Sequence, residues 1–292
     1  MGHGIAYLFA AAGHQVRVHD ANPAALDTLP GRLRSIQLLL GDDDSVLTRI
    51  QPQAQLEDAV RDARFVFEAA AENIAVKQAL FADIERLVSG DTVLASNTSA
   101  IPIHLIARDL RHKARMVGAH FWNPPHLVPL VEVVQMAPEN LPTVESMMEL
   151  LRAAGRHPVH VRRDVPGFIG NRLQHALKRE AIALVASGIC DAETVDDVVK
   201  LGFGPRLAVL GPLEQSDMVG LDLTKSIHDV LIQDLDRTPH TQDYLNQLVA
   251  DGNLGMKTGQ GFRHWTPALA NAVREKLSAF LAAAARRSKS QP

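Results

Sequence analysis

The chain has 292 residues, of which 46% are hydrophobic and 22% charged, and its formal net charge is −3. This length favours two domains, and the composition excludes a disordered chain. The small net charge gives no reason to expect nucleic acid or an anionic membrane surface as a partner. The single cysteine, Cys190, excludes an internal disulfide and indicates a reducing compartment, so we expect a cytoplasmic protein.

The first half of the sequence alternates between strand-like and helix-like hydrophobic patterns. Helices are predicted at residues 5–13, 73–88 and 144–154. Predicted strands cover residues 15–19, 64–69, 92–96, 115–120, 131–135 and 158–162. Such alternation predicts an α/β domain with a mostly parallel, doubly wound sheet of the Rossmann type. No run of about eighteen apolar residues occurs, so we expect no membrane span.

The pattern changes after Pro166-Gly167, where strand candidates end. Only helical periodicity follows, at residues 168–187, 192–201, 223–235, 242–250 and 268–286. We therefore predict two domains: an α/β domain over residues 1–165 and an all-helical domain over residues 166–292.

The start of the chain carries part of a dinucleotide-binding pattern. Gly2 and Gly4 open the first helix, and the strand that follows closes with Asp20. In a Rossmann domain a glycine lets this helix pack on the sheet, and an acid at that strand end binds the ribose hydroxyls of NAD. The carboxylate repels a 2′-phosphate, which favours NAD over NADP. Asp20 alone could equally be an ordinary turn residue.

The first strand and first two glycines of this pattern would precede Met1. Either translation begins upstream of Met1, or the product lacks this strand and much of its affinity for NAD. We favour the first explanation, because nothing else in the domain looks decayed.

A histidine and an acid stand in two neighbouring apolar runs. His120 ends the predicted strand 115–120, and Glu132 lies inside the strand 131–135, with a Pro-rich loop between them. A buried carboxylate needs a partner, and an imidazole held by a carboxylate is a general base. The alternative is a hydrogen-bonded pair with a purely structural role.

Short segments across both halves follow one another in a recognisable order. They include Glu68-Ala-Ala-Ala-Glu72-Asn73, Ser96-Asn-Thr-Ser99, His120-Phe-Trp-Asn123-Pro, Leu130-Val-Glu132-Val, Pro166-Gly-Phe-Ile-Gly-Asn171-Arg, Gly211-Pro-Leu-Glu214 and Lys257-Thr-Gly-Gln-Gly-Phe262. With Met1-Gly-His-Gly-Ile-Ala before them, they make the chain resemble the 3-hydroxyacyl-CoA dehydrogenase family from Gly2 to about Trp265. The resemblance implies NAD-dependent oxidation of the 3-hydroxyl of an (S)-3-hydroxyacyl-CoA, a step of fatty acid metabolism.

The resemblance also implies roles for individual residues. His120 is the expected base and Glu132 its partner, while Ser99 and Asn171 are expected beside the substrate oxygen. The residues expected to contact NAD are Glu72, Lys77, Asn123 and Lys257. Each has a plainer reading, since Asn171 could cap a helix and the segments around Ser99 and Lys257 could be turns. The thirteen histidines form no recognisable metal-ligand set with nearby acids.

Two departures from the family pattern leave the substrate open. Residues 21–55 are short, broken by Pro and Gly, and acidic at Asp42-Asp-Asp44, where the acyl-CoA enzymes carry a Lys-rich helical excursion. The chain also resembles the branch that holds λ-crystallin, L-gulonate dehydrogenase and carnitine dehydrogenase, which act on small 3-hydroxy acids. A non-catalytic structural relative unable to bind NAD is a third possibility. By the same resemblance, the apolar helices 168–187 and 223–235 are expected to form a homodimer interface.

Overall fold

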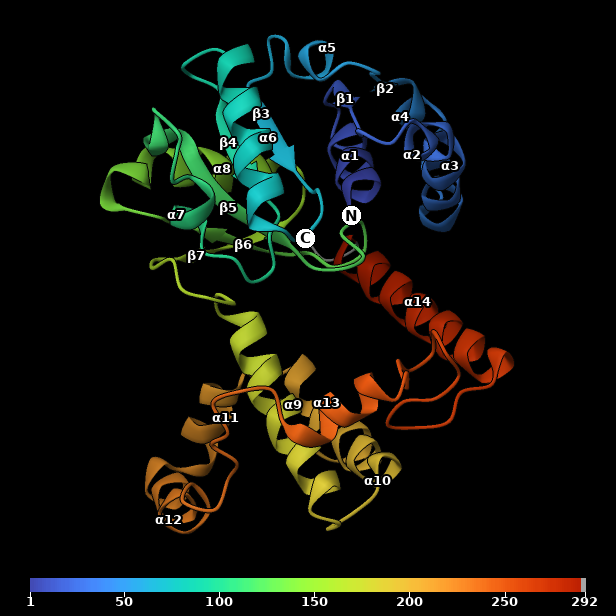
Figure 1. Cartoon of the computed structure of the whole chain (residues 1–292), viewed down its shortest axis with the longest axis vertical. Helices are drawn as coiled ribbons and strands as arrows, with labels where there is room; N and C mark the ends of the chain where they lie inside the picture. Colours follow the sequence, from blue (N-terminus) through green and yellow to red (C-terminus); the bar gives the residue numbers. More distant parts are fainter. Residues whose placement is uncertain (290–292) are drawn as a thin grey trace. The chain divides into compact units, whose positions relative to one another are not determined.

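The computed structural model describes residues 1–289, so the last three residues of the predicted helical domain lie outside the described residues. The chain forms two compact units (Figure 1). Unit 1 comprises Met1–Arg172 together with the chain from Leu277 onward, and unit 2 comprises Leu173–Lys276. Unit 1 is an α/β domain and unit 2 is helical, which confirms the predicted fold class.

Unit 1 contains two sheets. Its strands are β1 (Val16–Val18), β2 (Ile50–Pro52), β3 (Phe65–Glu68), β4 (Val93–Ser96), β5 (Met116–Phe121), β6 (Leu130–Val134) and β7 (His157–Val161). A parallel pair, β1-β2, stands apart from a five-stranded sheet of order β3-β4-β5-β6-β7. Six of these strands were predicted from the sequence, and the short β2 was not.

The larger sheet is mixed. Strands β3, β4 and β5 are parallel, β6 is antiparallel to β5, and β7 is parallel to β6. The connection over residues 122–129 is too short for the helical crossover that parallel strands require, so β6 must turn back along β5. This reversal brings the carboxyl end of β5 and the amino end of β6 to the same edge of the sheet.

Helices cover both faces of the larger sheet. Those of unit 1 are α1 (Gly2–Ala11), α2 (Pro23–Asp27), α3 (Leu29–Leu40), α4 (Ser45–Thr48), α5 (Leu56–Val60), α6 (Ile74–Leu87), α7 (Ile103–Ile106) and α8 (Leu141–Ala153). One core cluster joins α1 and α8 to one face through side chains such as Phe9 and Met147. A second joins α6 and α7 to the opposite face through Phe81 and Ile103. Unit 1 is therefore doubly wound, as its alternating sequence predicts.

Unit 2 differs from unit 1 in its burial. Its helices are the larger part of α9 (Gly170–Ala186), α10 (Ala192–Asp197), α11 (Pro212–Val219), α12 (Leu221–Leu231), α13 (Asp243–Ala250) and the start of α14 (Pro267–Lys289), with a π-helical segment at Val198–Phe203. In the part of the chain that the structure describes, α9 to α13 contain no buried residue. Among the described residues, no helix has the length and apolar character needed to cross a membrane.

Candidate active site

His120 and Glu132 face each other across the β5–β6 pair. They are direct cross-strand neighbours in the register, and His120 Nδ1 lies 2.8 Å from Glu132 Oε2. His120 is 5% exposed and Glu132 1%. In the described part of the chain, Nε2 of His120 has no hydrogen-bond partner. A carboxylate that accepts from Nδ1 fixes the tautomer in which Nε2 can accept a proton.

The second carboxylate oxygen of Glu132 caps the amino end of helix α9. Glu132 Oε1 accepts hydrogen bonds from the backbone N–H groups of Ile169 and Gly170, both at 2.9 Å. Burial alone would raise the pKa of Glu132, but the hydrogen bonds from His120, Gly170 and Ile169 outweigh it, so the pKa is lowered. Glu132 is therefore held as an anion between the imidazole and a helix N-terminus.

Close packing fixes the imidazole from the sides. The rings of Trp122 and Phe168 lie 5.6 and 5.8 Å from that of His120, centroid to centroid. A Cβ on Gly170 would stand 2.2 Å from Trp122 Cζ2, so only glycine allows this approach. Phe168 has φ of +52°, a strained value for a side chain of this size, and it is 1% exposed.

Ser99 and Asn171, the two residues expected beside the substrate oxygen, are joined by a hydrogen bond. Asn171 Nδ2 donates to the backbone oxygen of Ser99 at 2.7 Å. Glu72 holds the turn at Ser99: its Oε1 accepts from Thr98 Oγ1 and from the N–H groups of Ser99 and Ala100. Burial would raise the pKa of Glu72, but these hydrogen bonds and Lys77 lower it. Glu72 therefore shapes the turn that presents Ser99.

A buried ion pair lies beside this turn and escaped the sequence analysis. Lys77 Nζ is 2.7 Å from Glu68 Oε1 and 3.5 Å from Glu72 Oε2, and the side chain of Lys77 is 1% exposed. Glu68 also accepts from Ser96 Oγ at 2.6 Å. The signal was available, because Glu68 ends an apolar strand just as Glu132 sits inside one. Lys77 is therefore paired with Glu68 at the end of β3 and with Glu72 in the loop that follows this strand.

Two of the residues expected to hold NAD, Gly2 and Asp20, lie near the carboxyl ends of β3 and β1. Helix α1 begins at Gly2, whose Cβ position lies 3.9 Å from Ala69, the residue after β3. Its first N–H groups lack intrahelical partners, and such a helix end favours anions. Asp20 follows the end of β1 and is exposed, and its Oδ1 accepts from the N–H of Asn22. A helix N-terminus and an exposed acid at the carboxyl ends of strands are the features with which a Rossmann domain binds a dinucleotide.

Gly4 has a packing reason to be glycine. A Cβ there would approach Pro125 Cγ to 2.7 Å and His126 Nδ1 to 3.1 Å. Desolvation, with the charges of His3 and Arg156, lowers the pKa of His126 to about 4. The start of α1 is thus locked against the loop that follows β5.

The two remaining residues predicted to contact the cofactor are both exposed. Asn123 is exposed in that loop, just after β5. Lys257 is exposed and belongs to unit 2. Within residues 1–289, no group of three or more His, Cys, Asp or Glu side chains could hold a metal ion.

Comparison with known proteins matches two parts of the chain to family domains. Residues 1–165 match the NAD-binding domain of 3-hydroxyacyl-CoA dehydrogenase, and residues 167–265 match its C-terminal domain. The chain belongs to the 3-hydroxyacyl-CoA dehydrogenase family. This member is accordingly an NAD-dependent oxidoreductase, which confirms the predicted cofactor and the predicted class of enzyme.

The proteins that resemble this chain are of two kinds, and pyridine-carboxylate dehydrogenases form the first. A 5-formyl-3-hydroxy-2-methylpyridine 4-carboxylate 5-dehydrogenase from Mesorhizobium japonicum is 35% identical over 98% of this chain and 94% of its own length. A solved structure of an enzyme of this name, described as an NAD⁺-dependent dismutase, superposes with a TM-score of 0.92 at 34% identity, covering 100% of this chain and 96% of the other.

Acyl-CoA enzymes form the second kind. A probable 3-hydroxybutyryl-CoA dehydrogenase from Bacillus subtilis is 37% identical over 90% of this chain and 93% of its own length. The structure of the (S)-3-hydroxybutyryl-CoA dehydrogenase from Ralstonia eutropha has a TM-score of 0.74 at 30% identity, covering 91% of this chain and 95% of the other.

Proposed function

We propose that this family member oxidises a small carboxylated alcohol or aldehyde with NAD, and that its substrate carries no CoA. The observation that supports this most strongly is the likeness to the pyridine-carboxylate dehydrogenase structure, which extends over the entire chain at a TM-score of 0.92. The acyl-CoA enzyme structure from Ralstonia eutropha reaches 0.74 and covers 91% of the chain.

The segment after Asp20 supports the same choice. Its cations are few, and two of them are occupied: Arg34 Nη1 lies 2.5 Å from Asp44 Oδ1, and Arg49 donates to the backbone oxygen of Ala10. The phosphates of CoA need basic partners, which this acidic stretch offers poorly.

The chemistry assigned to the site needs only one carbon that bears both a hydrogen and a hydroxyl. Bound NAD would supply the hydride acceptor for that carbon. His120 Nε2 takes the hydroxyl proton, while Glu132 keeps Nδ1 protonated and stabilises the imidazolium. An aldehyde enters the same scheme as its hydrate, which presents the same H–C–O–H unit, loses one hydride and one proton, and leaves as a carboxylic acid.

The other predicted residues are proposed to support this step. Ser99 and Asn171 would polarise the substrate oxygen, and the hydrogen bond from Asn171 Nδ2 to the backbone oxygen of Ser99 holds the Asn171 amide beside Ser99. Asp20 would bind the ribose of NAD, with Gly2 and Gly4 at the pyrophosphate. The further cofactor contacts proposed are Glu72, Lys77, Asn123 and Lys257, of which the buried Lys77 would act by fixing Glu72.

An (S)-3-hydroxyacyl-CoA is the second candidate substrate. It is favoured by the 37% identity to the 3-hydroxybutyryl-CoA relative from Bacillus subtilis. The same proton and hydride transfers would turn its 3-hydroxyl into a 3-oxo group. Only the binding of the remainder of the molecule distinguishes the two candidates.

A four-substrate assay tests the proposal by following NADH at 340 nm. The pairs are 5-formyl-3-hydroxy-2-methylpyridine 4-carboxylate with NAD, L-gulonate with NAD, L-carnitine with NAD, and acetoacetyl-CoA with NADH. Turnover with a small acid and none with the thioester is expected. Preferred turnover of acetoacetyl-CoA would overturn the choice of substrate. His120→Gln should abolish turnover and leave NADH binding intact, and loss of NADH binding instead would make His120 structural.

We also propose that the protein is a homodimer through unit 2. Helices α9 to α13 bury no residue, although they carry large apolar side chains. The most exposed large apolar side chains of unit 2, in these helices and in the segments between them, are Ile189, Leu201, Val209, Leu213 and Val230, each at least 71% exposed. An apolar surface of this kind marks an interface. Analytical ultracentrifugation should therefore give twice the mass of the monomer.

We propose a cytoplasmic location as well, because the chain has a single cysteine and so no internal disulfide.

A further inference from the structure

The segment that leads from β7 into the first residues of α9 lies against the proposed active site over five consecutive residues, Gly167–Asn171. We call these residues the site turn. In chain order, their partners are the backbone oxygen of Ala100, the ring of His120, one carboxylate oxygen of Glu132 for two successive N–H groups, and the backbone oxygen of Ser99. The position of the site turn therefore determines what surrounds the imidazole and where the amide of Asn171 lies.

The site turn has a backbone conformation that its own sequence does not favour. Gly167 has φ of +74° and Phe168 has φ of +52°. A positive φ is freely available to glycine but strained for a residue with a large side chain, so the surrounding structure must hold Phe168 in it. The ring of Phe168 is buried in the same core cluster as Ile103 of α7. The site turn thus depends on an anchor outside itself.

Asp164, which precedes the site turn, provides such an anchor. Its side chain is 3% exposed. Oδ1 accepts from Ile103 N–H at 2.9 Å, and Oδ2 accepts from His104 N–H at 2.7 Å and lies 2.7 Å from His104 Nδ1. These two N–H groups open helix α7, whose N-cap residue is Pro102, and a proline side chain has no acceptor to cap them. Asp164 therefore caps α7 from a distant part of the chain.

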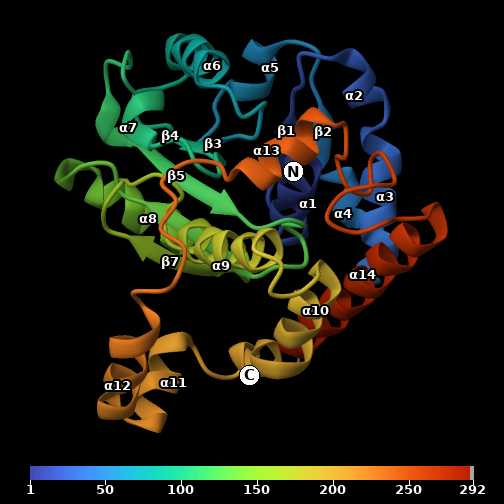
Figure 2. The same ribbon diagram turned by 60° about the horizontal axis from the view of Figure 1, so that its bottom comes forward.

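The start of α7 is a fixed point of unit 1. Ile103 is fully buried, and a Cβ on Gly118 of β5 would stand 2.9 Å from Ile103 Cδ1. Helix α7 accordingly lies beside β5 (Figures 1 and 2). The turn at Ser99 leads into the same helix and is held at its other end by Glu72. Asp164 therefore ties the site turn to the element that follows Ser99.

We propose that Asp164 is a positioning residue for the reaction, an inference that rests on the proposed function because it takes His120, Ser99 and Asn171 as the groups that act on the substrate. By binding the start of α7, Asp164 fixes the site turn. This holds the ring of Phe168 against His120. It also keeps the amide of Asn171 beside Ser99. The plainer role is that of a cap that only stabilises α7, and the two roles differ in what a new cap would restore.

The test therefore gives α7 a cap of its own. Asp164→Ala removes both the cap and the anchor, whereas Pro102→Ser added to it supplies a hydroxyl that accepts from the first turn of α7. In Asp164→Ala we expect kcat to fall by about ten- to hundredfold with KM for NAD unchanged, because a small misplacement near the reacting atoms costs rate. The double variant should regain stability in urea and keep the low kcat. Recovery of kcat in the double variant would overturn the inference.

Amide hydrogen exchange gives a readout that does not depend on turnover. Exchange at Gly167, Ile169 and Gly170 should be faster by about tenfold or more in both variants. In the double variant the amides of α8 should return to wild-type rates. If the wild-type protein turns over no substrate, the proposed function fails and the exchange rates still decide the inference. Unchanged exchange at the amides of the site turn would overturn it.

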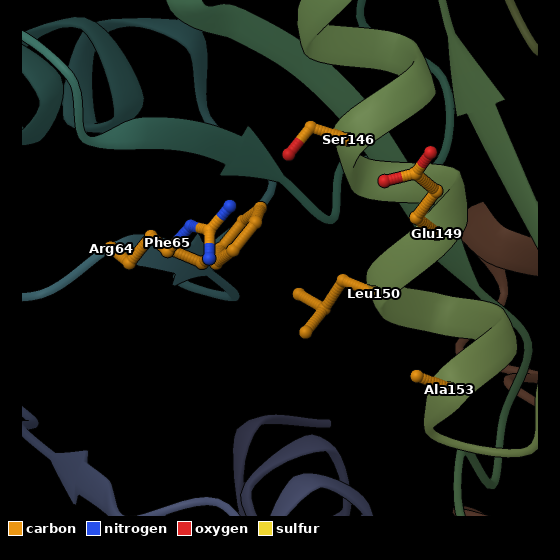
Figure 3. A pocket seen from close by; sticks show the side chains of 6 residues that line it. All are labelled: Arg64, Phe65, Ser146, Glu149, Leu150 and Ala153. Carbon is orange, nitrogen blue, oxygen red and sulfur yellow. The ribbon is translucent and has the colours of Figure 1, made fainter.

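Two control variants lose stability without contacting the site turn. Glu85→Gln is the matched carboxylate, because Glu85 also accepts from two successive backbone N–H groups. Leu150→Ala lies at a pocket of about 230 Å³ between α8 and the start of β3, with Leu150 on one side and Phe65 on the other (Figure 3). Both controls should unfold at a lower urea concentration and keep the wild-type kcat. A loss of kcat in the controls equal to that in Asp164→Ala would overturn the inference, because general destabilisation would then explain the rate.

Discussion

Replacing Glu132 by Gln separates the two tasks of this side chain. One carboxylate oxygen accepts from His120 Nδ1, and the other accepts from the N–H groups of Ile169 and Gly170. Glutamine has one oxygen and one NH₂ group, so it cannot accept on both sides. If its oxygen serves the two backbone donors, its NH₂ faces Nδ1 and forces the proton onto Nε2. His120 then holds the wrong tautomer for a base.

The rate should fall by about 10²–10⁴, the usual contribution of a general base and its partner. This corresponds to about 3–5 kcal/mol of transition-state stabilisation. The folded state also loses a charge-assisted hydrogen bond, which costs about 1.5–3 kcal/mol of unfolding free energy. The assay is kcat at saturating NAD with the active substrate, together with urea unfolding and NADH binding measured by fluorescence.

Glu85→Gln is the matched control. Glu85 likewise accepts two backbone N–H bonds, from Arg111 and His112, and it makes no contact with His120. Its substitution should destabilise the fold to a similar degree and leave kcat unchanged. A Glu132→Gln enzyme with a near wild-type kcat would refute the orienting role. An equal loss of kcat in both variants would show that destabilisation, and not the tautomer, explains the rate.

Three further substitutions probe the surroundings of the site. Gly170→Ala should cost about 1–3 kcal/mol in urea unfolding, because its Cβ would collide with Trp122. Lys77→Met should cost about 3–5 kcal/mol, since it leaves the buried Glu68 carboxylate without its cation, and adding Glu68→Gln should recover part of this loss. The pKa of His126 is lowered from 6.5 to about 4, so its neutral form stabilises the fold above pH 6.5 and that stability is lost as the pH falls towards 4. His126→Asn should therefore flatten the fall in unfolding free energy between pH 7 and pH 4.5.

Two of these substitutions have a matched control in the chain. Gly31→Ala lies in α3 with nothing within 4 Å of its Cβ position, and it should be neutral or stabilising by up to about 1 kcal/mol. Lys225→Met breaks an exposed ion pair with Asp229 and should cost less than about 1 kcal/mol. If Gly170→Ala were as stable as Gly31→Ala, the argument from packing would be wrong. If Lys77→Met cost no more stability than Lys225→Met, the argument from the buried charge would be wrong. An unchanged pH slope in His126→Asn would exclude that histidine as its cause.

Most of what could be predicted about the fold came from patterns among residues that are close in sequence. Six of the seven strands follow from short apolar runs, because a strand with covered faces needs apolar side chains at neighbouring positions. The three-residue β2 left too few positions for such a pattern. The alternation predicts a mostly parallel sheet, and four of the five pairings between the described strands are parallel. The antiparallel turn at residues 122–129 follows from loop length, which the alternation does not record. Helix α11 also went unpredicted, since it is short and follows a Pro-Gly-rich stretch.

The sequence by itself determined the alternating α/β domain, the helical domain and the pairing of His120 with Glu132, because these depend on periodicity, on loop length and on the cost of burying an acid without a partner. Only the tertiary structure decided that Glu132 also closes the start of α9, and that Lys77 is buried between two carboxylates. Only it showed that, among the described residues, β1 pairs with β2 alone and β3 with β4 alone. These features join residues far apart in the chain, and no local pattern records which distant groups a fold brings within hydrogen-bond reach.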